Sequence, residues 1–272
     1  MGCGNIYPDE KKWGNQHSYV TRRSDSESHP VSLIVACVCS VITQNIILTM
    51  RYYRNYQLYA NNPISGAYLR WAYRKGIEDL ATIGFRPDFS KKNFSCLLCG
   101  DGNERTADEF IKFVTSRNPD AIIWIIDIAE EHLKEVVKLV TKKYKDSDIR
   151  IIRTNALDLL GIIPRSNIDW IETDAFFEFF DEGSLEKLLQ VWYELLMPEG
   201  FITTRDYENE GTVSALAVYF LRKIVMEWWL GVKIYRHTRN DFDTAFESSR
   251  LRVVERTTVF PTYKRFSFVK DI

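Results

Sequence analysis

The stretch SCLLCGDGNE (residues 95–104) decides the fold of this chain, because an apolar run ends there on a glycine-containing turn. Residues 95–99 predict a short buried strand, and residues 107–114 predict a helix. A second apolar run, IIWII (residues 122–126), ends on Asp127. This order builds a nucleotide-binding βαβ unit. The glycines let the backbone approach a ligand closely, and an acid at the tip of the next strand can accept two ribose hydroxyl hydrogen bonds.

Further elements follow in an ordered series. RIIRTNAL (residues 150–157) and IDWIET (168–173) follow, and residues 188–196 then lead into MPEGFI (197–202). Together with the glycine turn and the NPDA segment at 118–121, this series resembles the class I S-adenosylmethionine-dependent methyltransferases over about residues 90–272. Two positions depart from the pattern of that family. Leu98 stands where an acid is usual, and Glu104 replaces the third glycine.

The resemblance implies an α/β, Rossmann-like fold with a seven-stranded, mostly parallel sheet whose last strand is antiparallel. It also implies S-adenosylmethionine as cofactor, with Asp127 on the ribose, the backbone of 100–103 beside the methionine moiety, residues 155–157 flanking the adenine and Ile128 packing on a ring face. Asn155 has an alternative role as the cap of a turn. The full set of expected cofactor-binding residues is Tyr73, Arg74, Cys99, Gly100, Asp101, Gly102, Asn103, Asp127, Ile128, Asn155, Ala156, Leu157, Glu172 and Thr173.

The organisation along the chain predicts three parts. Residues 1–30 are polar and irregular, which is typical of a flexible tail. Residues 31–89 predict an N-terminal helical cap, and residues 90–272 the methyltransferase domain, with a helical insertion at about 211–240. Within the cap, residues 31–50 carry no charge, which favours a helix packed in the protein or in a homodimer interface over a membrane anchor. Residues 51–85 are rich in tyrosine and arginine, and Pro63 predicts a break between two helices. Tyr73 and Arg74 are expected at the cofactor carboxylate, and the alternative is that such aromatic residues pack on the sheet while the arginines are solvated.

Composition narrows the class of protein. The net charge of -1 argues against a nucleic-acid partner, since such proteins carry a marked basic excess. The 45% apolar and 27% charged residues among 272 are typical of a globular domain, here expected to be cytoplasmic. The five cysteines lack metal-site spacing and are interpreted as reduced, and the four histidines show no ligand pattern, so no metal is expected.

Methyl transfer from a sulfonium is an in-line displacement, so the protein mainly has to place the acceptor and exclude water. His237 and Asp206 are the candidate bases, because both follow predicted strands or lie in the insertion. Residues 172–175 (ETDA) stand where enzymes that methylate amino groups of DNA bases or glutamine have Asn-Pro-Pro-aromatic, which favours a small-molecule acceptor such as a specialised metabolite or a lipid-like acid. The alternatives are a catalytically inactive binding or scaffold protein of the same fold, and a nicotinamide-dependent Rossmann enzyme.

Overall fold

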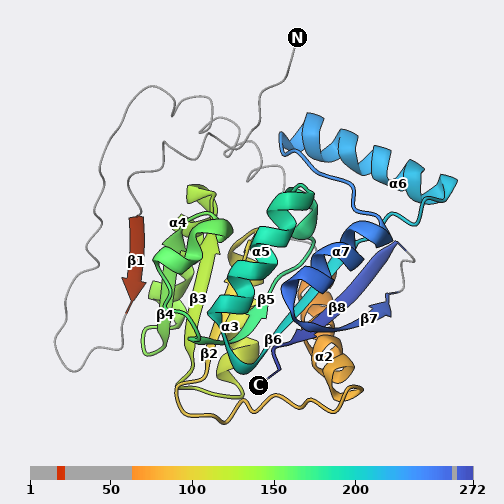
Figure 1. Cartoon of the computed structure of the whole chain (residues 1–272). Coiled ribbons are helices and arrows are strands. Elements are labelled where there is room, and N and C mark those ends of the chain that lie inside the picture. Colours follow the sequence, from red (N-terminus) through yellow and green to blue (C-terminus); the bar gives the residue numbers. More distant parts are fainter. Residues whose placement is uncertain (1–16, 22–62, 259–261, 272) are drawn as a thin grey trace.

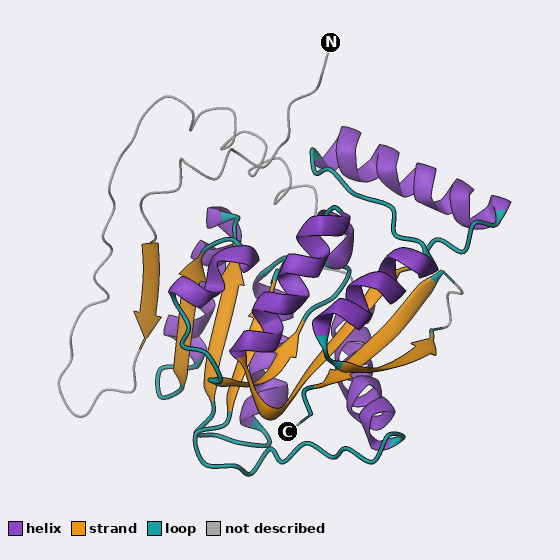
Figure 2. Ribbon diagram, in the orientation of Figure 1, coloured by secondary structure: helices purple, strands orange, loops and turns teal. Residues whose placement is uncertain are grey.

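The computed structural model describes residues 17–21, 63–258 and 262–271, and these build one sheet covered by helices on both faces (Figure 1; Figure 2). The sheet has eight strands in the order β1-β4-β3-β2-β5-β6-β8-β7. Their bounds are β1 His17–Thr21, β2 Ser95–Cys99, β3 Ile122–Asp127, β4 Asp148–Arg153, β5 Ile168–Glu172, β6 Leu196–Tyr207, β7 Arg252–Thr257 and β8 Tyr263–Val269. Strands β4, β3, β2, β5 and β6 are parallel neighbours, and β8 runs antiparallel to both β6 and β7. The predicted mostly parallel sheet with an antiparallel last strand is therefore confirmed.

The eighth strand, β1, was not predicted. Residues 17–21 fall in the segment expected to be a flexible tail, yet they pair antiparallel with β4, Tyr19 facing Ile151. The physical reason is that β4 would otherwise be an edge strand with unpaired backbone groups, and this short run contains aromatic and β-branched residues that suit a strand. The prediction of a flexible tail is therefore wrong for residues 17–21, which form a strand.

Helices complete the two outer layers. Their bounds are α2 Pro63–Ala81, α3 Glu104–Thr115, α4 Glu130–Lys143, α5 Glu182–Leu195, α6 Val213–Lys223 and α7 Arg239–Ser249, with 3-10 helices η2 (Ala156–Gly161) and η3 (Phe177–Phe179) and a π-helical segment η4 (Ile224–Leu230). Helices α2, α3 and α4 cover one face of the sheet, and α5, α7 and η2 cover the other. No helix among the described residues is long and apolar enough to cross a membrane.

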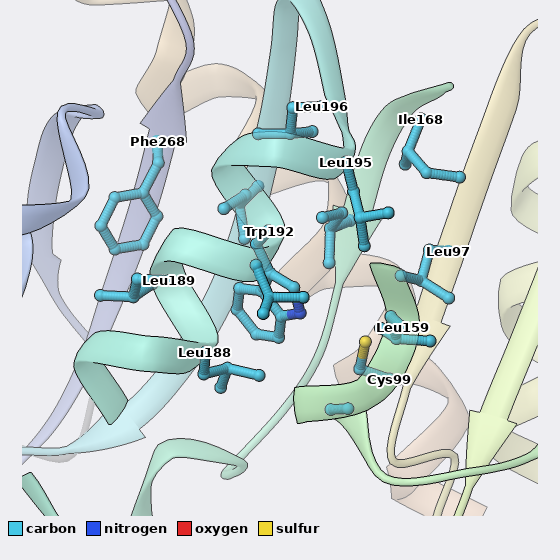
Figure 3. Packing of buried hydrophobic residues seen from close by; sticks show 14 of the residues in the cluster. Leu97, Cys99, Leu159, Ile168, Leu188, Leu189, Trp192, Leu195, Leu196 and Phe268 are labelled. Carbon is cyan, nitrogen blue, oxygen red and sulfur yellow. The ribbon is translucent and has the colours of Figure 1, made fainter. Parts of the chain in front are cut away.

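Strand alternation sends neighbouring residues into different cores. Leu98 packs beneath α2 and α3, which explains an apolar residue at the position where an acid is usual in the resembling family. Leu97 and Cys99 point the other way, into the core beneath α5 around Trp192 (Figure 3). Both Cys96 and Cys99 are buried free thiols, as expected. The residues predicted as two helices over 51–85 are described only from 63 onward, where α2 starts at Pro63 as predicted.

The described portion of the segment expected to be a helical cap contains α2, which is a helix of the sheet's own outer layer. It contacts α3, β6, β7 and β8 and contributes Leu69, Tyr73 and Leu80 to the core. Residues 31–62 lie outside the described part. Helix α6 and the segment η4 follow β6, within the range expected for a helical insertion, and they lie beyond α7, apart from the sheet and its two layers of helices (Figure 1).

Candidate functional site

The glycine turn lies at the carboxyl end of β2, where the strand order reverses between β2 and β5. Gly100 and Gly102 both have positive φ, 67° and 65°, which explains glycine at these two places. Asn103 caps α3 by accepting a hydrogen bond from the Thr106 amide, so the turn runs directly into a helix N-terminus. In open α/β sheets, ligands bind outside the carboxyl ends of the strands at such a reversal point. The turn therefore occupies the position of a nucleotide site.

The loops after the neighbouring strands are tied to this turn by backbone hydrogen bonds. The Gly100 amide donates to the carbonyl of Ile126 (3.0 Å), and the Thr154 amide donates to the carbonyl of Asp127 (3.1 Å). On the other side, the Thr173 hydroxyl donates to the carbonyl of Cys99 (2.9 Å). The structure thus brings most of the predicted cofactor residues, those at 99–103, 127–128, 155–157 and 173, to one edge of the sheet.

Asp127 ends β3 beside two groups that sequence reasoning did not connect with it. His132 Nδ1, on the first turn of α4, lies 3.6 Å from Asp127 Oδ2 and 3.9 Å from Asp101 Oδ1. Burial raises the pKa of Asp127, but hydrogen bonding to His132 and its charge bring the pKa below the ordinary value. Burial, then the charge of Asp127 and a hydrogen bond between the two carboxyl groups, raise the pKa of Asp101 well above its ordinary value. The buried Asp101 and His132 and the partly buried Asp127 therefore form one cluster, in which each acid affects the pKa of the other.

The same three side chains form the one set within the described residues whose donor atoms, within 4.8 Å of one another, could hold a metal ion. The sequence contains no signal for this set, because Asp101 and His132 are separated by a whole strand and come together only when β2 and β3 pair. Their donor types, two carboxylates and one imidazole, suit a divalent transition metal.

The region expected to flank adenine has an open apolar surface. Ile128, directly beside Asp127, is 51% exposed, so its side chain is accessible to a ligand. Asn155 caps η2 by accepting a hydrogen bond from the Leu157 amide (3.0 Å), so the alternative role as a turn cap is confirmed. Ala156 is buried and Leu157 packs partly into the core.

Asp206 and His237, expected as bases, instead hold a loop. Asp206 is fully buried and accepts hydrogen bonds from the amides of Phe176 (3.2 Å) and Phe177 (3.0 Å). His237 is 2% exposed, and its Nε2 donates to the carbonyl of Phe177 (3.1 Å). Burial lowers the pKa of His237, so the neutral ring is favoured. Both predictions are corrected: strand and insertion geometry aim these two side chains at the backbone after β5 rather than into an open site.

The loop after β5, to which Asp206 and His237 bind, places the ring of Phe176 against the glycine turn. A Cβ atom added to Gly100 would stand 2.7 Å from the Phe176 ring, so that ring lies directly against the glycine. Phe176 is also stacked with Trp192 at a centroid distance of 6.2 Å, which fixes its position from the core side. Asp206 therefore acts on the glycine turn indirectly, through Phe176.

The Asp206 carboxyl predicts a pH-dependent stability. Burial raises its pKa to about 8, so the folded protein keeps a proton that the unfolded chain releases near pH 4. This group's contribution to stability is complete below about pH 4 and is lost as the pH rises to about 8. We expect Asp206→Asn, which does not titrate and keeps an oxygen acceptor for one of the two amides, to reduce the fall in unfolding free energy between pH 5 and pH 8 by about 1–3 kcal/mol. Urea unfolding of both proteins at the two pH values measures this, and equal slopes would contradict it.

A second cluster lies between α2 and the carboxyl ends of β5 and β6. Arg205 donates to Glu172 Oε1 (2.5 Å) and to Asp174 Oδ1 (3.0 Å), and both Arg205 and Glu172 are 1% exposed. The hydroxyls of Tyr263 (2.6 Å) and Tyr68 (3.3 Å) also donate to Asp174 Oδ1. Burial raises the pKa of Glu172 to about 7, against the opposing effect of Arg205. Asp174 is the exposed member, with 27% of its side chain accessible.

Three predicted cofactor residues are placed elsewhere by this arrangement. Glu172 belongs to the buried ion cluster beneath α2. Tyr73 is fully buried against Phe110 and Trp170, because it lies on the inner face of α2. Arg74, one residue further along α2, is exposed and close enough to Arg117 for the two positive charges to interact, which places it near the end of α3 on the amino edge of the sheet. All three are therefore corrected as ligands of the glycine-turn site.

Sequence reasoning missed Asp174, Phe176 and Arg205, although one signal was available. Asp174 and Phe176 follow a predicted strand directly, in the loop that lies beside the glycine turn in a doubly wound sheet.

Comparisons with known proteins agree with this geometry at the level of the fold. No family model matches the chain, and no curated protein does. Among solved structures, a possible exported protein from Bordetella parapertussis superposes with a TM-score of 0.54 at 12% identity, covering 73% of this chain and 68% of that one. The S-adenosylmethionine-dependent methyltransferase SibL gives 0.52 at 11% identity, covering 84% and 69%. Geranyl diphosphate C-methyltransferase from Streptomyces coelicolor A3(2), solved with S-adenosyl-L-homocysteine, gives 0.52 at 9% identity, covering 77% and 82%. The chain thus has the class I S-adenosylmethionine-dependent methyltransferase fold.

Proposed function

We propose that this protein is an S-adenosylmethionine-dependent methyltransferase that acts on a small-molecule acceptor. The observation that carries the proposal is the pair of left-handed glycines, Gly100 and Gly102, at the strand-order reversal, with the Asp127 carboxylate at the tip of the adjacent strand. The fold shared with solved methyltransferases supports it. Asp127 would accept the ribose hydroxyls, Ile128 would pack on the adenine, and the amides of the turn would lie beside the methionine moiety.

The acceptor would bind over β5 and β6, between the start of α2 and the insertion. Tyr68 of α2 reaches Asp174, and Arg222 of α6 donates to both oxygens of Glu178 (2.6 and 2.7 Å), so both segments meet the loop that follows β5. Within that loop, the partly exposed Asp174 carboxylate is positioned by three donors and is the group best placed to orient an acceptor or take its proton. Asp206 and His237 would have no direct part in the reaction.

The Asp127 carboxylate provides the direct test. We expect Asp127→Asn to weaken S-adenosylmethionine binding by about 2–4 kcal/mol, about 30- to 1,000-fold, because an amide replaces a charged acceptor of two hydrogen bonds. Asp148→Asn is a matched control, since Asp148 forms its ion pair with Arg150 at the opposite end of the strands. Calorimetric titration of the three proteins measures the difference, and unchanged affinity in Asp127→Asn would remove this residue from the site.

The same titrations separate the alternatives. Binding of a nicotinamide dinucleotide in place of S-adenosylmethionine would favour a dehydrogenase, and cofactor binding without turnover of any acceptor would favour an inactive scaffold of the same fold. Tight Zn²⁺ binding that requires Asp101, Asp127 and His132 and that excludes S-adenosylmethionine would show that the acid cluster is a metal site. The Asp127 carboxylate cannot use the same oxygens to coordinate a metal ion and to accept the ribose hydroxyl hydrogen bonds.

A further inference from the structure

The segment α6–η4, residues 213–230, exposes an apolar face that contains no charge. Its exposed residues are Val213, Ser214, Ala217, Val218, Phe220, Leu221, Ile224, Val225, Trp228 and Trp229. Several are exposed to an unusual degree, with Phe220 at 59%, Leu221 at 66% and Ile224 at 60%. Only Ala215 and Leu230 of the segment are buried. An apolar surface of this extent marks an interaction site rather than a solvated face.

The segment is held in place on its opposite side, so the apolar face has a fixed direction. Arg222 reaches inward to Glu178 and stacks on the ring of Tyr207, with its guanidinium carbon 3.4 Å from the ring centroid. Thr212 caps the start of α6, and Gly231, with φ of 76°, ends the segment. The three charged residues in between, Arg222, Lys223 and Glu227, are only partly exposed.

The start of α2 lies at the same corner of the molecule. A chain of contacts leads from Tyr68 to Asp174 (3.3 Å), to Tyr263 (2.6 Å), to Tyr207 (ring centroids 4.4 Å apart) and on to Arg222. Because α2 passes from Asp174 at the carboxyl edge to Ile83 beside Arg252, its first residue, Pro63, projects from the carboxyl edge. Pro63, the first described residue of this part of the chain, therefore lies on the side from which α6–η4 extends.

We infer that the apolar face of α6–η4 is a docking surface for residues 51–62 of the same chain. That segment, RYYRNYQLYANN, precedes Pro63 directly and places Tyr52, Tyr56 and Tyr59 at the i, i+4, i+7 spacing of one helical stripe. Twelve residues span about 18 Å as a helix and up to about 40 Å extended, against about 27 Å for the whole of α6–η4, so the tether is long enough. The aromatic stripe would cover the uncharged face, and the tether raises the effective concentration of the segment above that of any separate partner.

Hydrogen exchange in the full-length protein tests this inference. We expect Tyr56→Glu to speed amide exchange across residues 213–230 by about tenfold, because a charge in the stripe would displace the segment from an apolar surface. Gln57→Glu adds the same charge one position away, off the stripe, and is expected to change exchange by less than about twofold. Leu221→Glu should reciprocally speed exchange in residues 51–62, since coupling between two surfaces acts in both directions.

Any one of the following three results would overturn the inference. Equal exchange in Tyr56→Glu and Gln57→Glu would show that the stripe does not cover α6–η4. Protection of residues 213–230 that grows with protein concentration, with a matching rise in mass by light scattering, would assign the face to a second copy of the chain. Protection that appears only with vesicles containing anionic lipid would assign it to a membrane surface. The unfolding temperature of each variant, measured in parallel, distinguishes local undocking from global destabilisation.

Discussion

Arg205→Met is expected to destabilise the protein by about 3–5 kcal/mol, because the change leaves the acids at 172 and 174 without their buried cation. Arg205 is 1% exposed and pairs with both Glu172 and Asp174. The matched control is Arg165→Met, which removes an ion pair to Glu194 in which both side chains are exposed (63% and 45%), and which should cost about 0–1 kcal/mol. Urea unfolding at pH 8 measures both, and equal losses would contradict the assignment of a buried cluster.

The pH dependence of the Arg205→Met effect gives an independent check. Burial already raises the pKa of Glu172 to about 7 with the cation in place, so its contribution to stability is present at low pH and lost as the pH rises through about 7. Without Arg205 the carboxyl group should be protonated over a wider range of pH. The destabilisation is therefore expected to be smaller at pH 5 than at pH 8, and Glu172→Gln added to Arg205→Met should restore part of the loss at pH 8. A loss independent of pH would indicate a packing defect instead.

Gly100→Ala is expected to cost about 2–4 kcal/mol and to abolish cofactor binding. The substitution forces a left-handed conformation on alanine, for about 1–2 kcal/mol, and its methyl group would stand 2.7 Å from the Phe176 ring. Because Phe176 is held by Asp206 and stacked with Trp192, the strain should pass into the glycine turn rather than be relieved by ring movement.

Gly84→Ala is the matched control for this effect. Gly84 has φ of 80°, but an added Cβ would meet no atom within 4 Å, so it reports the cost of the conformation alone, about 1–2 kcal/mol. The difference between the two unfolding free energies measures the contact with Phe176. If Gly100→Ala and Gly84→Ala lose the same stability and Gly100→Ala still binds cofactor, the ring does not constrain the turn.

The site divides into groups that local pattern could place and groups that it could not. Short apolar runs located β2, β3 and β5, and the glycines at 100 and 102 marked the two left-handed positions of the turn. Asp127 follows from the same pattern, since it is the first polar residue after a buried strand. The direction of a side chain at the carboxyl edge was much harder to predict. Glu172 and Arg205 point beneath α2, whereas Thr173 and Asp206, one residue later, face the glycine turn and its neighbouring loop.

The sequence by itself therefore determined the order of the elements, the conformation of the turn and the acid at the tip of β3. These depend on hydrophobic periodicity and on glycine's freedom at positive φ, which are local properties of the chain. Only the tertiary structure decided that His132 lies beside Asp101 and Asp127, and that Asp206 and His237 bind the backbone of Phe177 instead of a substrate. It also decided that Tyr73 belongs to the core and that Arg74 lies at the amino edge of the sheet. Finally, it decided that residues 17–21 add a strand to the sheet. Each of these features depends on strand pairing or on the rotation of a helix against the sheet. Contacts between residues far apart in the chain determine both.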